Sequence, residues 1–327
     1  MRIEEFVAGK HKKCYEYSCF VPSLVNHEWT WESQSLTVSL EKAVRALASL
    51  DACSQFVPDI GLFIRMHIVH EASASSRIEG TQTEMEEAIL PETSIEEERR
   101  NDWREVNNYV NAMNSSIESL KTLPLSMRLL REAHRHLMTG VRGEHKCPGE
   151  IRTTQNWIGG HSIATAKYIP PAAEYVQDLL SDLEKFWHND DIKVSKLIRC
   201  AISHYQFESI HPFLDGNGRI GRLLIPFYLI CEQELSSPSL YISAYFERNR
   251  DLYYDSLSRV RTENDLIGWV LFFLEAIKET AQNGCGKFKR IFALRDEMNE
   301  YSHKCSNTAL TQKLFKNLYR VPRMTIN

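Results

Sequence analysis

The twelve residues from His211 to Arg222, read as HPFLDGNGRIGR, constrain the fold of this chain more than any other segment. Residues 194–209 before them carry apolar side chains at helical spacing, and residues 219–235 after them are rich in Leu, Ile and Phe. A short polar loop between two helical patterns must turn tightly into the N-terminus of the second helix. Such an N-terminus has unpaired N–H groups and a partial positive charge, so it attracts anions. Helical patterns also dominate elsewhere, which predicts an all-α fold with an anion site at this turn.

The glycines, amide and arginines of this loop suit a polyphosphate. Gly216 and Gly218 can adopt positive φ and, without a Cβ, let a phosphate approach the backbone closely. Asn217 tolerates the same backbone region and adds an amide donor. Arg219 and Arg222 are three residues apart and project from one face of the helix. Two guanidinium groups aimed at one anion fit a triphosphate better than a monophosphate.

Two other side chains of the loop supply chemistry. Asp215 is a hard oxygen ligand at the position where a Mg²⁺ ion bridging phosphates would lie. His211, with an unperturbed pKa of about 6.5, is largely neutral at pH 7 and can take a proton from an attacking hydroxyl. The loop therefore predicts transfer of part of a polyphosphate to a hydroxyl. An alternative zinc site of His204, Glu208 and His211 would leave the Asp-Gly-Asn-Gly run without a role.

The segment resembles the signature of the Fic domain family (Fic/DOC) and matches it at every defining position. The resemblance implies an all-α, Fic-type helical core with a short β-hairpin flap and a small helical C-terminal tail. It implies transfer of AMP from ATP, with Mg²⁺, to a Ser, Thr or Tyr hydroxyl of a protein target or of the chain itself. His211 would be the catalytic base and Asp215 the metal ligand. The implied nucleotide-binding residues of the motif, with the arginines on the β- and γ-phosphates, are His211, Gly216, Asn217, Gly218, Arg219, Ile220, Gly221 and Arg222.

Residues 150–171 interrupt the helical pattern. Strand-forming residues flank Gly159-Gly160, and two prolines close the segment, which predicts a β-hairpin. The resemblance implies a flap that pairs with the target backbone by strand addition, with Ile158, Gly159 and Gly160 bordering the nucleotide. A hairpin that only connects two helices is the alternative.

A paired aromatic, Tyr253-Tyr254, follows the motif at a distance found in many Fic proteins. Tyr253 is the candidate for contacting adenine, with a plain core position as the alternative. Some relatives carry an Asn seven or eight residues beyond the pair, where this chain has Arg261 and Thr262.

Residues 75–80, SSRIEG, fit the inhibitory pattern of the same family. Ser75 and Glu79 are one helical turn apart and share a face, and Gly80 follows them. In relatives with this pattern the Glu pairs with the second motif arginine, here Arg222, and removes the partner of the γ-phosphate. The resemblance thus implies an N-terminally inhibited (class II) member. A glutamate that is merely solvated at a helix end is the alternative.

The remaining patterns give an order of elements. Residues 1–30 have an irregular pattern, and residues 282–287, with two glycines, resemble a hinge. We expect an N-terminal helical region over 1–90, a Fic core over 91–282 and a helical tail over 283–327, which the resemblance suggests is the start of a winged-helix module. A Ser94–Glu97 capping box marks the start of one expected helix. The expected helices cover residues 36–54, 60–78, 94–120, 126–138, 173–188, 194–209, 219–235, 245–261 and 265–281.

The composition indicates the cellular compartment of the protein and argues against some classes of partner. The net charge of −4 over 327 residues gives no nucleic-acid footprint. The sequence has no apolar run of about 18 residues that could span a bilayer and no apolar signal region at its start. Eight scattered cysteines without CxxC pairs fit free thiols in a reducing cytoplasm, so we expect a cytoplasmic protein with no membrane partner. A homodimer stays open.

Other functions remain open beside AMP transfer. They are removal of AMP by the same site, transfer of phosphate or phosphocholine on the same fold, and a DNA-associated regulator. Relatives that transfer phosphate usually replace a Gly or an Arg of the motif, and all of these are present here.

Overall fold

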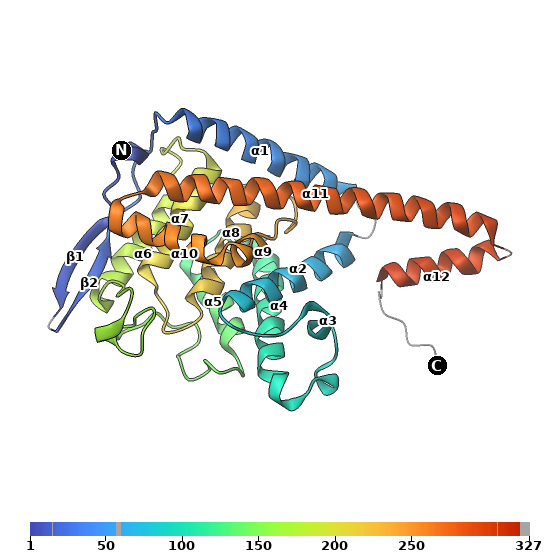
Figure 1. The fold of residues 1–327 in the computed structure, drawn as a ribbon, viewed down its shortest axis with the longest axis horizontal. Helices are drawn as coiled ribbons and strands as arrows, with labels where there is room; N and C mark the ends of the chain where they lie inside the picture. Colours follow the sequence, from blue (N-terminus) through green and yellow to red (C-terminus); the bar gives the residue numbers. More distant parts are fainter. Residues whose placement is uncertain (15, 57–59, 306, 321–327) are drawn as a thin grey trace.

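The computed structural model describes residues 1–14, 16–56, 60–305 and 307–320. Its longest element, α11 (Leu266–Lys304), runs across the whole molecule alongside α1 (Gln34–Gln55) (Figure 1). The other α-helices are α2 (Ile60–Ile78), α3 (Met85–Ala88), α4 (Arg100–Leu120), α5 (Met127–Met138), α6 (Ala173–His188), α7 (Lys196–Ile210), α8 (Asn217–Cys231), α9 (Ser243–Arg248), α10 (Arg250–Glu263) and α12 (Thr308–Arg320). The expected all-α architecture is confirmed.

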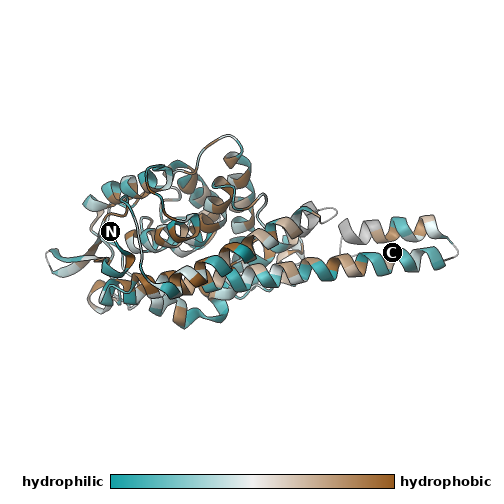
Figure 2. Ribbon diagram, turned by 90° about the horizontal axis from the view of Figure 1, so that it is seen from above, coloured by the Kyte–Doolittle hydropathy of each residue, from teal (hydrophilic) through white to brown (hydrophobic). Residues whose placement is uncertain are grey.

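The centre of the body is formed by α7 and α8, which pack on each other. Every residue of α7 after Lys196 is buried, and nearly all of α8 is buried as well. A helix that is buried all round needs apolar residues on every face, which explains the dense Leu, Ile and Phe content of both segments. Coloured by hydropathy, the body shows apolar stretches along its inner helices (Figure 2). The 211–216 loop is therefore held between the two most buried helices.

Four of the expected helices match the structure closely, namely 36–54, 60–78, 126–138 and 173–188. The capping box at Ser94 is wrong, because α4 begins only at Arg100. Ser94 instead ends a 3₁₀ turn, η2 (Glu92–Ser94), and a second one, η3 (Glu97–Arg99), follows. Ile95 between them is extended and buried, so the chain is drawn into the core before the helix can start.

Two further expectations are corrected. The pattern over 245–261 is two helices, α9 and α10, which meet at Asn249. The hinge expected at 282–287 is absent, since α11 is continuous through these described residues. Gly284 serves a close helix contact there: a Cβ at this position would lie 2.7 Å from Leu50 Cδ1 on α1.

Residues 1–30 contain order that their composition did not predict. Strands β1 (Gly9–Cys14) and β2 (Tyr17–Pro22) pair antiparallel, after a 3₁₀ turn, η1 (Ile3–Glu5). The hairpin expected at 150–171 is by contrast reduced to one antiparallel bridge, Ile158–Tyr168, and a 3₁₀ turn, η4 (Ile163–Thr165). The N–H groups of His161 and Ser162 donate to the Thr165 hydroxyl, so they are not available for a ladder.

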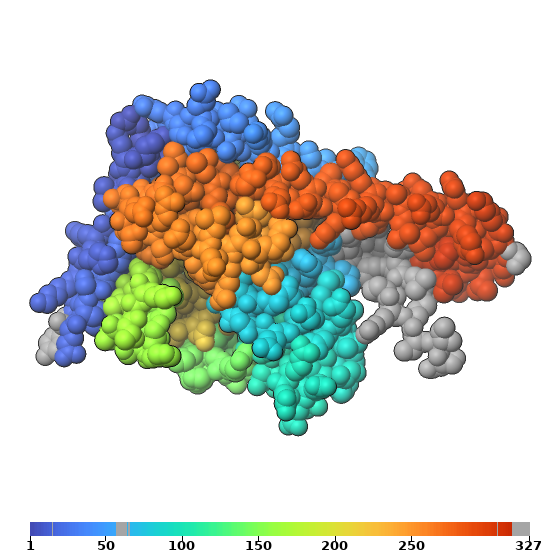
Figure 3. Space-filling view, in the orientation of Figure 1, coloured from blue at the N-terminus to red at the C-terminus, as the bar shows by residue number. Residues whose placement is uncertain are grey.

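Beyond Phe288 and Phe292, which still pack on the core, the C-terminal end of α11 extends away from the body and packs against α12, and this end forms a projection (Figure 3). All eight cysteines are free thiols. Among the helices of the described residues, none combines the length and the apolarity needed to cross a bilayer.

Candidate active site

His211 ends α7 in the left-handed backbone region, with φ 51° and ψ 62°. A non-glycine residue in this region is strained and needs support from its surroundings. The buried Arg152 supplies it by donating from Nε to the His211 carbonyl at 2.9 Å, and Asn156 donates to the same oxygen at 3.1 Å. The residue is thus fixed at the start of the loop.

The imidazole of His211 is set up to accept a proton. Its Nδ1 lies 3.3 Å from the Glu208 carbonyl oxygen, and a carbonyl can only accept, so Nδ1 carries the hydrogen. Nε2 then keeps its lone pair. Burial lowers the pKa of His211 to about 4, so the ring is neutral at pH 7.

The next turn of chain starts α8. Gly216 has φ 74°, as expected, but Gly218 is helical rather than positive in φ. Asn217 closes the loop on itself: its Oδ1 accepts from the Phe213 N–H and its Nδ2 donates to the Phe213 carbonyl, both at 2.8 Å. One N–H of this amide is thus used inside the loop, and donation to a ligand by the other stays a prediction. The backbone N–H groups of residues 217–219 remain for an anion, because no helical turn precedes them.

Asp215 precedes this turn with a side chain that is half exposed. One carboxylate oxygen accepts the Gly216 N–H at 2.6 Å. Its carbonyl accepts from Nε2 of the buried His134 at 2.9 Å, while His134 Nδ1 accepts the Gly149 N–H at 2.7 Å. The His134 ring also stacks on Phe213 at 3.9 Å. A histidine on α5 therefore fixes the backbone that presents Asp215.

The two arginines of the motif are both buried and both paired. Arg219 contacts Glu105 of α4 at 3.1 Å and Asp215 at 3.9 Å. Arg142 approaches the same Glu105 at 3.0 Å, so this carboxylate bridges two guanidinium groups. Glu105 thus orients Arg219 at the mouth of the anion site.

Arg222 is bound by the end of α2. Its Nε donates to the Ser75 hydroxyl at 2.8 Å, and its Nη2 donates to the Glu79 carboxylate at 2.6 Å and to the Ser75 carbonyl at 3.0 Å. Burial alone would raise the pKa of Glu79, but the charge of Arg222 holds it below its ordinary value, so Glu79 is ionised. A Cβ at Gly218 would collide with this carboxylate. Glu79 therefore lies directly over the start of α8, within the space for an anion.

These groups surround one cavity of about 530 Å³. Its walls include the α2 end, the motif, the flap bridge and the start of α10. The lining residues are Glu79, Gly80, Glu105, Arg142, Gly143, Trp157, Ile158, Gly159, Glu208, His211, Leu214, Asp215, Gly216, Asn217, Gly218, Arg219, Arg222, Tyr253 and Tyr254.

Some residues of the expected set lie outside its walls. Ser75 is buried beneath Arg222, and Ile220 faces the core. Gly221 packs on the Glu208 carboxylate, and Gly160 packs on Thr165 in the flap. These residues pack against the side chains and backbone that line the cavity, so they contribute to the site indirectly.

The alternative zinc site is excluded by the bonds of His204. Its Nδ1 donates to the Gly221 carbonyl at 2.8 Å, so its Nε2 accepts the Tyr253 hydroxyl at 2.9 Å. Both ring nitrogens are used. The same bond buries the Tyr253 hydroxyl, and the ring stacks on Phe246, so Tyr253 offers the cavity only a ring surface. Tyr254, which is 39% exposed, is the more accessible aromatic.

Comparison with known proteins gives matches to two family models, and the second of them includes the motif. The model described as "Fic/DOC family N-terminal" matches residues 37–118, and the "Fic/DOC family" model matches residues 124–229, which together exceed half of the chain. The chain belongs to the Fic/DOC family. Its curated relatives include Protein adenylyltransferase fic-1 of Caenorhabditis briggsae, 33% identical over 139 residues, which are 42% of this chain and 25% of that protein. Protein adenylyltransferase Fic of Culex quinquefasciatus is 31% identical over 157 residues, 48% of this chain and 28% of that protein. The chain thus spans less than a third of these relatives.

Solved structures of Fic proteins share the fold. A Fic family protein from Desulfovibrio desulfuricans has a TM-score of 0.64 at 22% identity, covering 78% of this chain and 75% of that one. Residues 134–508 of Fic-1 from Caenorhabditis elegans give a TM-score of 0.58 at 20% identity, covering 80% and 74%.

Mg²⁺ fits the Fic site through Asp215. Mg²⁺ is commonly held by one or two carboxylates together with substrate phosphates and waters, rather than by an all-protein cage. Asp215 lines the cavity beside the anion site, and its second carboxylate oxygen has no hydrogen-bond partner in the described residues. Over the same residues, no group of three or more His, Cys, Asp or Glu could hold a metal ion alone. The donor set therefore suits a cation that is bound together with phosphates.

If the site catalyses the transfer that its motif implies, the pH dependence of that reaction should reflect the neutral His211. Because burial lowers its pKa to about 4, loss of the base should begin far below the ordinary value of 6.5. The acid limb of kcat/KM, which reports the free enzyme, should lie near pH 4 to 5. Glu208 titrates nearby, since burial raises its pKa to about 7, so the profile is best measured with Glu208→Gln. An inflection at pH 6.5 in that variant would contradict the assignment.

Proposed function

We propose that the chain is a cytoplasmic protein adenylyltransferase that moves AMP from ATP to a hydroxyl of a protein or of itself. The observation that carries the proposal is the neutral His211 facing a cavity that also holds an anion site and two buried arginines. The curated relatives named protein adenylyltransferases support it. The intact glycines and arginines of the motif favour AMP transfer over phosphate or phosphocholine transfer.

In this reaction, each functional group of the site has one role. The N–H groups of residues 217–219 bind phosphate oxygens, and Arg219 and Arg222 neutralise the phosphates beyond the α-phosphate. The target hydroxyl oxygen attacks the α-phosphorus, its proton passes to His211 Nε2, and the bond to the leaving pyrophosphate breaks. Mg²⁺ held by Asp215 would offset phosphate charge. The edge of the flap beside Ile158 orients the target backbone.

We infer that the same site is inhibited by Glu79. Glu79 occupies part of the anion site and bonds Arg222, so ATP must compete with a carboxylate for one guanidinium. The inhibitory residue comes from the same chain, on α2.

Radioactive labelling tests the proposal. The chain carrying Glu79→Gly should retain label from α-³²P-ATP and not from γ-³²P-ATP. Retention of the γ label would instead identify a phosphate-transferring enzyme, and retention of neither would remove the transferase assignment.

Asp215→Ala should raise the magnesium requirement sharply. The metal offsets phosphate charge during displacement, and this substitution removes its protein ligand. We expect the half-saturating Mg²⁺ concentration to rise by about tenfold or more, measured in the Glu79→Gly background. Asp178→Ala, which removes an exposed carboxylate on α6 outside the cavity, is the matched control. An unchanged magnesium titration would show that Asp215 is not the ligand.

A further inference from the structure

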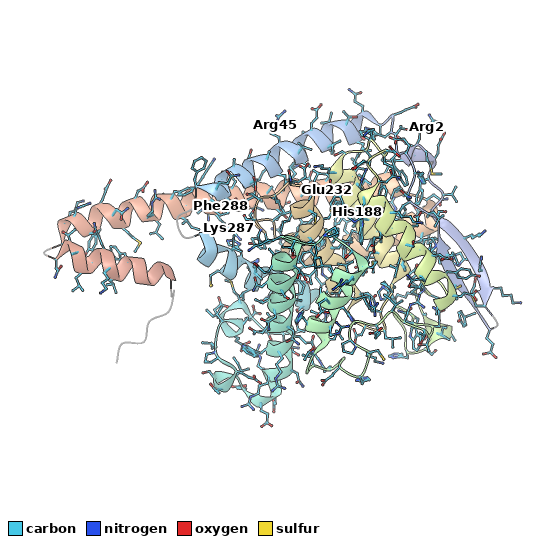
Figure 4. The ribbon with its side chains drawn as sticks, turned by 180° about the vertical axis from the view of Figure 1, so that it is seen from behind. Arg2, Arg45, His188, Glu232, Lys287 and Phe288 are labelled. Atoms are coloured by element: carbon cyan, nitrogen blue, oxygen red, sulfur yellow. The ribbon has the colours of Figure 1, made fainter. Side chains whose placement is uncertain are left out.

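A second cavity, of about 570 Å³, lies between α2, α9 and α11. The α2 residues that line it are His67, His70 and Arg77, whereas Ser75 and Glu79 of the same segment face Arg222. Successive helical residues turn by about 100°, so these two sets occupy nearly opposite sides of α2. Lys287 lines this cavity, near the point where α11 starts to leave the body (Figure 4). The cavity is therefore separate from the active site.

Positive charge exceeds negative charge in its walls. Arg77, Arg248, Lys287 and Arg290 line it, against Glu247 as the one lining carboxylate of the described residues. Arg77 bonds Glu247 at 2.6 Å, and Arg248 bonds Glu279 at 2.6 Å. Lys287 and Arg290 contact no carboxylate in the described part of the chain. Burial, and then the charge of Arg248, lower the pKa of Lys287, as a cation without a partner requires. Lys287 and Arg290 are thus available to bind an anion.

Neutral polar groups complete the walls. Ser239 is 3% exposed, and its hydroxyl has no hydrogen-bond partner among the described residues. The buried Nδ1 of His70 lacks one in the same set. Burial lowers the pKa of His70, so the ring is neutral at pH 7 and can donate from one nitrogen. Buried polar groups without partners are costly, which favours an occupant that bonds them.

We propose that this cavity binds the diphosphate group of a small anion, either pyrophosphate or the phosphates of a nucleotide. Lys287 and Arg290 are one turn apart on α11 and supply charge from one side. Arg77 and Arg248 supply planar guanidinium groups, which match phosphate oxygens, from α2 and α9. Pyrophosphate is also the product that AMP transfer would release, but the site rests on its own residues and stands without that reaction.

Calorimetric titration of pyrophosphate into the full chain tests the site. Arg222→Ala serves as background because it should weaken binding of the anion in the active site. In this background, Lys287→Glu with Arg290→Glu should weaken pyrophosphate binding at least tenfold. The control is Arg45→Glu with Lys289→Glu, which makes the same charge change around another cavity, between α1 and α11. The control pair should bind pyrophosphate like its parent.

Each outcome decides the proposal. Equal binding by the two charge-reversed pairs would overturn it, as would an Arg222→Ala chain that binds no pyrophosphate although the unmodified chain does. If Arg222→Ala does not fold, the same pairs in the unmodified chain give the answer: the pocket pair must lose one binding event that the control pair keeps. Titration with ATP separates the sources, since a nucleotide site binds ATP more tightly than pyrophosphate and a diphosphate site does not.

Discussion

His211→Ala should abolish transfer almost completely while ATP still binds. A positioned general base contributes about 10²–10⁴-fold to rate, and the lone pair on Nε2 is the one that the structure leaves for the target hydroxyl. The rate of labelling from α-³²P-ATP should fall by that factor in the Glu79→Gly background. The dissociation constant of ATP should change by less than about threefold, because the anion site is made by backbone groups and arginines.

His136→Ala is the matched control for this prediction, because that histidine lies on α5 outside the cavity walls and its side chain is 41% exposed. Its labelling rate should equal that of the parent. A His211→Ala chain that labels at the parent rate would remove His211 from the mechanism, and one that also loses ATP binding would point to a collapsed loop instead.

Glu79→Gly should increase labelling by at least about tenfold. The Glu79–Arg222 pair is a charge-assisted hydrogen bond of 2.6 Å, and such bonds contribute about 1.5–3 kcal/mol. Since about 1.4 kcal/mol corresponds to a factor of ten, losing the competitor should release at least tenfold more productive ATP. The substitution falls just after the last residue of α2, so the helix itself should persist.

Two variants control this result. Glu86→Gly makes the same change at an exposed glutamate outside the cavity and should leave labelling at the low level of the unmodified chain. Arg222→Ala added to Glu79→Gly should cancel the gain, because the freed γ-phosphate would have lost its partner. Labelling by Glu79→Gly no higher than in the unmodified chain, at saturating ATP and Mg²⁺, would refute inhibition by Glu79 and leave the transferase proposal standing.

Local sequence predicted the parts of this site that local geometry determines. The turn into α8, the helix that carries Ser75 and Glu79, and the pairing of Glu79 with Arg222 all follow from the motifs and their resemblance to Fic proteins. The flap was placed correctly beside the cavity, but not as a full hairpin. The strands Gly9–Cys14 and Tyr17–Pro22 were missed because their sequences show no clear alternation of apolar and polar residues.

Long-range partners could not be read from spacing. Glu105 reaches Arg219 across 114 positions, and His134 reaches the Asp215 carbonyl across 81. Neither residue stands in a motif, and both lie on helices whose patterns show only an amphipathic face. The hinge expected from Gly284 and Gly286 was wrong for a related reason: a glycine that permits close helix packing looks the same in sequence as one that permits a bend.

Intact-mass and peptide mapping of the chain after incubation with ATP and Mg²⁺ tests the central claim most directly. The unmodified chain, Glu79→Gly, and Glu79→Gly with His211→Ala should be compared side by side. The account predicts an AMP adduct on a Ser, Thr or Tyr hydroxyl, or on an added protein substrate, that is abundant in Glu79→Gly, weak in the unmodified chain and absent without His211. An adduct of phosphate alone, or an AMP adduct equally abundant in all three chains, would contradict it.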